Sequence, residues 1–248
     1  MPEMTKYDHG VPSWADIGTP DPQAALKFYG TLFGWEGADQ GEEAGHYTIC
    51  TKNGKNVAAI SPAQDPGPPR WTTYVNVDNV DDVAKKAEAA GGTVVLPAMD
   101  VMGAGRMAIF QDTTGAFIAV WQPNQHIGAE LVNEPGTMIW NELATGDLAK
   151  SKAFYGETFG WTFGGAAEYA EGQVHGRTVA GIQPRPEMLP KEVPDHWLVY
   201  FASDDVDKST KQVTKLGGTV LVEPMDIPQG RFSVVMDPQG AAFGIYKG

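Results

Sequence analysis

The sequence predicts an α+β fold made of two similar domains, each built from two βαβββ units. The first observation is a long internal repeat, in which residues 28–35 return as residues 154–161 at an offset of 126 residues. The second is that strand-like and helix-like stretches recur in the same order four times along the 248 residues. The third is the content of 30 glycines and 18 prolines, which suits a β-rich chain with frequent turns. A repeat of this length is a duplicated domain, because solenoid units span only about 20–50 residues.

The repeat covers most of the chain and sets the predicted domain boundaries. Identical residues recur at the same offset in the pairs Trp14 and Trp140, Asp21 and Asp147, Trp71 and Trp197, Tyr74 and Tyr200, and Met99 and Met225. Near the end the offset slips by one, since Gly115 corresponds to Gly240. We therefore expect domain 1 over residues 1–123 (units at about 10–62 and 70–122) and domain 2 over residues 136–248 (units at about 137–185 and 195–247).

The first unit shows the local signals of each element. A strand is predicted over residues 11–17, and Asp21-Pro22 then provides an N-cap followed by a proline in the first helical turn. Apolar residues recur at helical spacing up to Gly34, which is a typical helix stop. Two strands follow over residues 47–51 and 57–60, joined by an Asn-Gly hairpin signal. A proline-rich segment, 62–69, closes the unit.

The second unit repeats this order. A strand is predicted over residues 72–77, and the helix that Asp81-Asp82 opens ends at Gly91-Gly92. Three strands follow, over residues 93–96, 106–110 and 116–121. The linker between the domains is expected between Pro123 and Gly136.

Composition excludes several classes of function. The net charge of −13 and the pI near 4.7 leave no basic face for nucleic acid. No apolar run approaches the roughly 18 residues of a membrane span. The single cysteine, Cys50, forms no intramolecular disulfide and supplies no cysteine metal cluster. Because the N-terminus is polar and lacks a signal-peptide core, and because the chain has a single cysteine, we expect a cytoplasmic protein. We also expect a monomer or homodimer whose partner is a small-molecule ligand or substrate, with no nucleic-acid or membrane partner.

Several motifs resemble one known family when they are taken in order. They are the helix motif over residues 25–35, the strand-helix segment 74–80, and the hairpins 112–116 and 237–241. Together they resemble the vicinal oxygen chelate superfamily, which contains glyoxalase I, bleomycin-resistance proteins and extradiol dioxygenases. The strand motifs 14–16 and 139–143, with His126-Ile127-Gly128-Ala129, are similar to those of actinobacterial tandem-domain glyoxalase-like proteins labelled hydroxylases. The resemblance implies that the two units of each domain form a half-open barrel around a cavity.

The resemblance also implies where a metal would be held. Metal enzymes of the family place His, Glu or Gln at one position on the first strand of each unit and at one position on a later strand. In this sequence those positions hold Trp14 and Trp140, about Thr72 and Leu198, Ala119 and Gly244, and residues near Ala59–Ile60 and Gly181–Ile182. Since these side chains lack the nitrogen and oxygen ligands of a divalent ion, we predict no metal and no other cofactor.

Alternation along the strands predicts what faces each cavity. If Trp14 faces inward, so does Asp16, and Trp140 likewise goes with Glu142. The same face carries Tyr74 and Tyr200, together with Phe117 and Trp121 or Ala242 and Tyr246. Each domain is thus expected to offer an aromatic pocket with one carboxylate. The alternative is that the two tryptophans plug the barrels and make the fold structural.

The two carboxylates are the candidate catalytic groups, because burial beside aromatic rings raises a carboxyl pKa toward the range of acid–base catalysis. Glu142 is favoured over Asp16 for its longer reach, although it could equally anchor a strand end. Further candidate ligand-binding residues are His46, Arg106 and Arg231. The arginines may instead pair with Asp100 and Asp226, which lie nearby in the sequence.

Two functions remain open from the sequence beside a purely structural role. The first is a metal-free protein that binds a small aromatic or planar metabolite in a barrel cavity. The second is a cofactor-independent isomerase or lyase, or a glyoxalase-like enzyme acting on an α-oxoaldehyde, that uses a cavity carboxylate.

Overall fold

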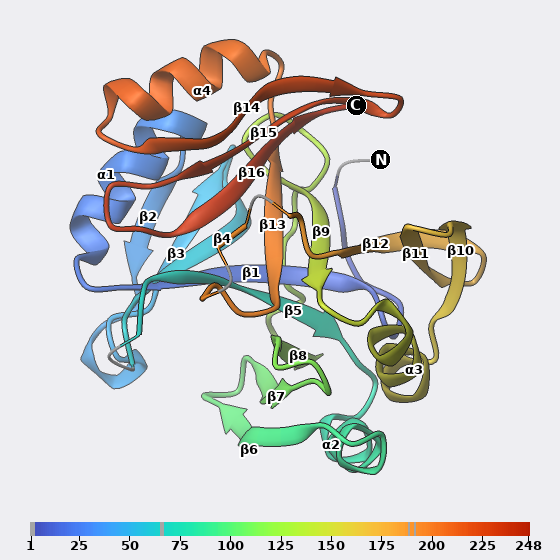
Figure 1. Ribbon diagram of the computed structural model, residues 1–248. Coiled ribbons are helices and arrows are strands. Elements are labelled where there is room, and N and C mark those ends of the chain that lie inside the picture. The colour runs from blue at the N-terminus through green and yellow to red at the C-terminus, as the bar shows by residue number, and fades with distance from the viewer. Residues whose placement is uncertain (1–2, 65–66, 188, 191) are drawn as a thin grey trace.

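The computed structural model describes residues 3–64, 67–187, 189–190 and 192–248 (Figure 1). Residues 1–2 of the predicted first domain and residues 65–66 of the predicted proline-rich segment lie outside the described residues. The described chain contains four βαβββ units, as the repeat predicts.

The four units have the following helices and strands. Unit 1 contains β1 (Pro12–Thr19), α1 (Pro22–Phe33), β2 (Glu36–Asp39), a 3-10 turn η1 (Glu42–Ala44), β3 (Thr48–Lys52) and β4 (Lys55–Pro62). Unit 2 contains β5 (Arg70–Asn76), α2 (Val80–Ala89), β6 (Thr93–Val101), β7 (Gly105–Gln111) and β8 (Phe117–Pro123). Unit 3 contains β9 (Met138–Thr145), α3 (Leu148–Phe159), β10 (Thr162–Ala166), β11 (Tyr169–Val174) and β12 (Arg177–Pro184). Unit 4 contains β13 (His196–Ala202), α4 (Val206–Lys215), β14 (Thr219–Ile227), β15 (Gly230–Met236) and β16 (Ala242–Lys247).

Units 1 and 2 share one eight-stranded sheet, here called domain 1, and units 3 and 4 share a second, here called domain 2. The strand orders are equivalent: β2-β3-β4-β1-β5-β8-β7-β6 and β10-β11-β12-β9-β13-β16-β15-β14. The first strands of the two units pair antiparallel at the centre of each sheet, and each is flanked by a parallel partner. We call the face that the helices cover the helix face, and the opposite face, which carries Tyr74 and Tyr200, the barrel face.

The predicted helix boundaries of α1 and α3 are confirmed. The side chains of Asp21 and Asp147 accept hydrogen bonds from the backbone N–H of Ala24 and Lys150, which satisfies N-terminal donors. The helices end where Gly34 and Gly160 adopt left-handed φ angles of 76° and 74°. A side chain would strain that conformation, so glycine is the natural residue there.

Two strands were not located from the sequence. All four residues of β2 are exposed, and its sequence Glu-Gly-Ala-Asp shows no apolar alternation. The equivalent β10, Thr162–Ala166, contains adjacent glycines and is likewise not apolar on one side. Both are edge strands, which bury neither face and so leave no periodic signal. The prediction for β6 ended too early, at residue 96, because an edge strand tolerates Pro97.

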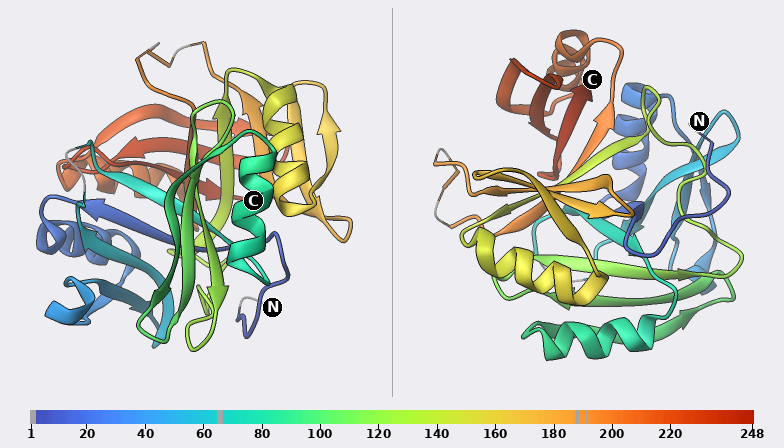
Figure 2. Two further views of the ribbon diagram at one scale, coloured as in Figure 1. Left: turned by 90° about the horizontal axis from the view of Figure 1, so that it is seen from below. Right: turned by 90° about the vertical axis from the view of Figure 1, so that its right-hand side faces the viewer.

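The helix faces of the two domains pack against each other, so the two domains share one hydrophobic core and do not have separate ones. Helix α1 lies beside α4, and α2 lies beside α3 (Figures 1 and 2). The ring of Phe33 on α1 lies 5.0 Å from that of Phe201 on β13, and Tyr29 lies 5.6 Å from Phe243 on β16. Unit 1 therefore shares its core with unit 4, and unit 2 with unit 3, so the domains form one body.

Two matched hydrogen-bonded chains cross this shared core. The Trp71 indole N–H donates to the Tyr29 hydroxyl (3.1 Å), which donates to the Asp237 carboxylate in the other domain (2.9 Å). The other oxygen of Asp237 accepts backbone N–H groups within its own hairpin turn, including that of Ala241. One side chain thus holds both the turn and the domain contact.

The repeat produces the same chain in the opposite direction. Trp197 donates to Tyr155 (2.8 Å), and Tyr155 donates to Asp112 (2.7 Å), whose second oxygen accepts the N–H groups of Thr114 and Ala116. Burial, together with the nearby Asp112 carboxylate, holds the pKa of the Tyr155 phenol well above its ordinary value. The phenol therefore stays protonated and keeps donating.

Removing the hydroxyl of Tyr29 should destabilise the whole protein. Tyr29→Phe leaves a buried carboxylate oxygen and a buried indole N–H without partners, which costs about 1–3 kcal/mol. The control is Tyr246→Phe, whose exposed hydroxyl bonds the Gln229 carbonyl and should contribute less than about 1 kcal/mol. Urea unfolding measures the free energy of unfolding of both variants. If the two substitutions lower it equally, the cross-domain hydrogen bonds of Tyr29 contribute no more to stability than a surface hydrogen bond does.

Candidate functional site

The barrel face of domain 1 gathers a carboxylate, a tryptophan and two tyrosines. The carboxylate of Asp16 on β1 accepts hydrogen bonds on Oδ2 from the hydroxyls of Tyr74 (2.8 Å) and Tyr47 (3.0 Å). The Trp14 indole N–H donates to the Tyr47 hydroxyl at 2.9 Å. The predicted grouping of Trp14, Asp16 and Tyr74 is therefore present in the structure.

Domain 2 holds the same connectivity around a longer acid. Glu142 on β9 accepts from Tyr169 on Oε2 (2.8 Å) and from Tyr200 on Oε1 (3.1 Å). The amide of Gln183 adds a third hydrogen bond to Oε1 at 2.6 Å. Trp140 donates to the Tyr169 hydroxyl at 3.1 Å. We call these two groups the Asp16 cluster and the Glu142 cluster.

The sequence interpretation missed Tyr47 in the Asp16 cluster, and it missed Tyr169 and Gln183 in the Glu142 cluster. The two tyrosines are equivalent, but they are 122 residues apart instead of 126, because the second hairpin region is four residues shorter. The shift of the offset hides the pair. Residues 59–60 already match 181–182 at the shorter offset of 122, and extending that match one strand back would have paired Tyr47 with Tyr169.

Burial without a cationic partner shifts the titration of both acids. Burial raises the pKa of Asp16 to about 6, and the hydrogen bonds from Tyr74 and Tyr47 offset only part of that effect. Burial likewise raises the pKa of Glu142, against the hydrogen bonds from Tyr169 and Tyr200. Each carboxyl therefore exchanges a proton more readily near neutral pH than an exposed acid does.

The two clusters differ in what covers them. Trp14 is 3% exposed, and the imidazole of His126 packs edge-on against its ring at a centroid distance of 4.6 Å. His126 belongs to the linker, which is bound to domain 1 by a hydrogen bond from the Ala129 N–H to the Ser13 carbonyl. Burial lowers the pKa of His126, which favours a neutral ring at this position. The predicted plugging of the barrel fits the geometry around Trp14.

The Glu142 cluster is more open. Trp140 and Tyr169 are half-buried, and among the described residues no aromatic ring stacks on Trp140. Phe232 on β15 lies 6.5 Å from Tyr200, and it pairs across the sheet with Met225 on β14, which is exposed. Phe232 therefore adjoins Tyr200, which binds the buried acid, and Met225 continues that apolar side of the sheet toward solvent.

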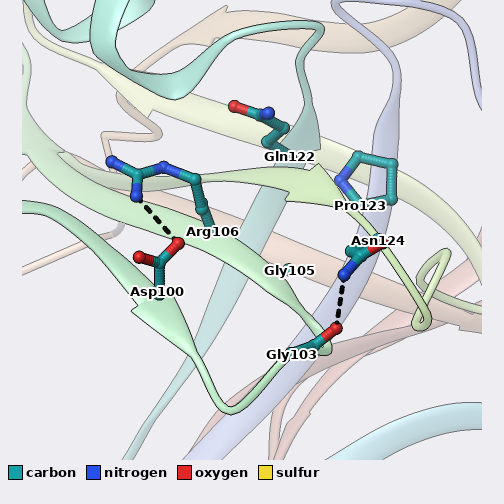
Figure 3. Close-up of a pocket in the computed structure, with 7 residues that line it drawn as sticks. All are labelled: Asp100, Gly103, Gly105, Arg106, Gln122, Pro123 and Asn124. Atoms are coloured by element: carbon teal, nitrogen blue, oxygen red, sulfur yellow. Dashed lines mark hydrogen bonds and ion pairs between the residues drawn. The ribbon is translucent and has the colours of Figure 1, made fainter.

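The other predicted ligand-binding residues lie elsewhere. His46 precedes β3 on an exposed loop, where its Nδ1 lies 3.0 Å from Asp39. Arg106 is held by Asp100 (2.8 Å) and Asp81 (3.1 Å) at the edge of a polar pocket of about 320 Å³ (Figure 3). The arginine–aspartate pairing that the sequence offered as an alternative is the arrangement in the structure.

Arg231 repeats this arrangement on domain 2. Its guanidinium bonds Asp207 through Nε at 2.7 Å and pairs with Asp226 at 3.0 Å. Because each arginine is neutralised by two carboxylates, neither offers a net positive charge to an anionic ligand. The structure brings none of His46, Arg106 and Arg231 to either cluster.

The residues of the clusters do not fit a family-type metal site. Among the residues that the structure describes, no group of three or more His, Cys, Asp or Glu side chains could hold a metal ion. Each cluster offers one carboxylate, and at least one oxygen of each, Oδ2 of Asp16 and Oε2 of Glu142, already accepts hydrogen bonds from tyrosine hydroxyls. A divalent ion would have to displace these donors without gaining further anionic ligands.

Comparisons with known proteins agree with this architecture. The description Glyoxalase/Bleomycin resistance protein/Dioxygenase superfamily matches residues 11–120 and 125–245, and the chain belongs to this family. It is 45% identical over 259 residues to "Putative glyoxylase CFP32" of Mycobacterium tuberculosis (strain CDC 1551 / Oshkosh), covering 100% of this chain and 98% of the relative. It is also 37% identical to the anthracycline biosynthesis protein DauV of Streptomyces sp. (strain C5), covering 98% and 95%.

Solved structures with the same fold include a dioxygenase and a Mn(II)-bound glyoxalase. The 2,3-dioxygenase LapB from Pseudomonas sp. KL28 aligns with a TM-score of 0.68 at 14% identity, covering 97% of this chain and 93% of that one. The Mn(II)-bound glyoxalase from Novosphingobium aromaticivorans aligns with a TM-score of 0.67 at 17% identity, covering 96% and 83%. At these identities the likeness shows the fold alone. Among the described helices, none has the length and apolar character that a membrane crossing requires.

The raised pKa of Asp16 predicts a pH-dependent difference in stability. The folded protein binds the proton more tightly than the unfolded chain, whose ordinary value is 3.8. The carboxyl's contribution is therefore fully present below pH 4 and is lost as the pH rises through about 6, by up to about 3 kcal/mol. Denaturant unfolding from pH 4 to 8 should show wild type losing stability relative to Asp16→Asn over this window, and a constant difference would contradict the assignment.

Proposed function

We propose that the protein binds a small planar aromatic metabolite on the barrel face of domain 2, and that it does so without a metal. The observation that carries the proposal is the Glu142 cluster. Here a buried carboxylate lies beside the half-buried rings of Trp140 and Tyr169, while the equivalent Trp14 is covered by His126. Binding sites for small molecules combine apolar surface with a few placed polar groups in this way.

The chemistry of the lining favours a flat ligand. The indole of Trp140 offers a π-face for stacking, and the side chains of Met225 and Phe232 provide adaptable apolar contacts. Glu142 can accept a hydrogen bond from a ligand hydroxyl or attract a ligand cation, which the net charge of −13 also favours. An anionic ligand would be repelled by the same group.

The name of one relative also supports a flat aromatic ligand. DauV carries the name of an anthracycline biosynthesis protein, and anthracyclines are flat, fused-ring aromatic molecules. The family positions for metal ligands hold Trp140, Leu198 and Gly244 in this domain, which supports binding through aromatic contacts in place of coordination. In the Asp16 cluster, Trp14 and Tyr74 would form a weaker or closed counterpart of the site.

Replacing Trp140 should weaken binding of a fused-ring anthraquinone probe. We expect Trp140→Ala to raise the Kd at least about tenfold, since an aromatic stacking contact and its buried area contribute on the order of 1–3 kcal/mol. Quenching of intrinsic fluorescence measures the Kd, before and after treatment with EDTA. An EDTA-sensitive Kd would contradict metal-free binding.

The control is Trp71→Phe, because Trp71 lies on the helix face and donates to Tyr29 in the shared core. It should leave the Kd unchanged while lowering stability. Equal effects of the two substitutions on the Kd would show that the probe does not bind the barrel face of domain 2.

The raised pKa values of the two acids favour a second candidate, an enzyme that uses a cavity carboxylate as general acid or base. The relative named "Putative glyoxylase CFP32" makes an α-oxoaldehyde one substrate class to examine. In such an enzyme Glu142 would exchange a proton with a substrate carbon or oxygen, and Asp16 would be the equivalent group in domain 1. Tyr169 and Tyr200 would hold the carboxyl in place.

Glu142→Gln separates the two functions. It preserves shape and removes both the charge and the base, so an enzyme should lose roughly 10²-fold or more in kcat/KM. Asp16→Asn is the matched control and should cost less, because its barrel is covered by His126. If turnover of every substrate tested survives Glu142→Gln and only affinity changes, the binding function is supported and the enzymatic one is rejected.

A further inference from the structure

The two barrels differ at two positions that flank their clusters. Gly181 on β12 lies opposite Glu142 on β9, whereas Ala59 on β4 lies opposite Asp16 on β1. Gly244 on β16 lies opposite Tyr200, whereas its counterpart Ala119 on β8 lies opposite Tyr74. At both register-equivalent positions, domain 2 has glycine where domain 1 has alanine.

Glycine is required at these positions because there is no room for a Cβ atom, and not because the backbone conformation excludes other residues. A Cβ on Gly244 would overlap three ring atoms of Tyr200, and a Cβ on Gly181 would overlap the Tyr169 hydroxyl and lie 3.1 Å from the Trp140 indole nitrogen. Neither glycine has a positive φ angle, so alanine would meet no backbone strain. The ring of Tyr200 and the hydroxyl of Tyr169 therefore rest directly on the strands beneath them.

This close approach changes how the acid is held. In domain 1 both tyrosine hydroxyls donate to the same oxygen of Asp16. In domain 2 the hydroxyls are separated, so that Tyr169 binds Oε2 and Tyr200 binds Oε1 of the longer Glu142. Because no Cβ lies beneath them, the Tyr200 ring and the Tyr169 hydroxyl lie closer to the strands than alanine at positions 244 and 181 would allow.

We infer that Gly181 and Gly244 are the positions that select domain 2 as the ligand-binding barrel. They act through Tyr169 and Tyr200 and need not touch the ligand, so they are positioning residues. By keeping both tyrosines against the sheet, they leave room for the thickness of an aromatic ring system over the Glu142 cluster. The inference rests on the proposed binding function and adds the reason why one barrel binds and the other does not.

The test compares the single variants Gly181→Ala and Gly244→Ala with the matched control Ala119→Gly in domain 1. The probe is the same fused-ring anthraquinone, its Kd is read from fluorescence quenching, and the thermal unfolding midpoint reports folding. Each glycine variant should weaken the probe at least tenfold. Ala119→Gly should leave the Kd unchanged. Acrylamide quenching without the probe gives a second readout, because raised tyrosines should shield Trp140.

The outcomes separate this inference from the proposed function. If Gly244→Ala fails to fold, Gly181→Ala decides, because its added methyl meets mainly a hydroxyl at the end of a side chain. Folded glycine variants that bind the probe as wild type does, while Trp140→Ala does not, overturn the inference and leave the binding function standing. Binding that survives Trp140→Ala as well overturns both.

Discussion

The arrangement of this protein depends on two buried tyrosine–aspartate hydrogen bonds that join the helix face of one domain to the hairpin turn of the other. Tyr29 reaches Asp237, and Tyr155 reaches Asp112, each with a tryptophan N–H bonded to the same phenol. Because each aspartate also binds the backbone of its own turn, the turn cannot relax without releasing the domain contact. The duplicated sequence thus encodes a reciprocal interface, in which each half supplies both the donor and the acceptor.

This interface determines where function can be located. Because the helix faces of the two domains pack against each other, with α1 beside α4 and α2 beside α3, the barrel faces lie on the opposite sides of the sheets from the shared core (Figures 1 and 2). A buried bond from Thr73 to Asn141, of 2.8 Å, also joins the central strands of the two sheets. Asn141 lies between Trp140 and Glu142 in sequence, so the strand that carries the Glu142 cluster is fixed from behind by the other domain. A rigid support of this kind keeps a binding site preorganised.

The sequence predicts the fold to a large extent because the information is local and repeated. Asp21, Pro22 and Gly34 specify the limits of a helix by short-range capping, and alternation correctly places Trp14, Asp16 and Tyr74 on one face. It does not predict that units 1 and 4 share a core, since alternation identifies a buried face and not the partner that buries it. Tyr47 and Tyr169 were not predicted as cluster residues because a four-residue difference in length shifts the repeat in this region.

The roles of Gly181 and Gly244 could not be predicted either, because a missing methyl group has meaning only beside a particular tyrosine ring. His126 shows the same limit, since its position in the linker does not reveal that it covers Trp14 in space. In each case the residue type is known from the sequence, but its role depends on which side chain lies next to it in the folded protein.

The paired changes at the two clusters argue that their connectivity is under constraint. Lengthening the acid from aspartate to glutamate is matched by removal of a methyl group on the adjacent strand, from Ala59 to Gly181, and the chain from tryptophan through tyrosine to carboxylate remains intact. Among the described residues the hydrogen bonds to each acid come from neutral donors, and burial raises the pKa of both, so the ionised form is less stable there than in water. Replacing buried charged groups with apolar side chains of similar volume is often neutral or stabilising, so packing alone does not require an acid here. A costly acid in both barrels is easier to explain by a role toward a ligand or substrate than by packing, and under the proposed function the more open surroundings of Glu142 favour domain 2 for that role.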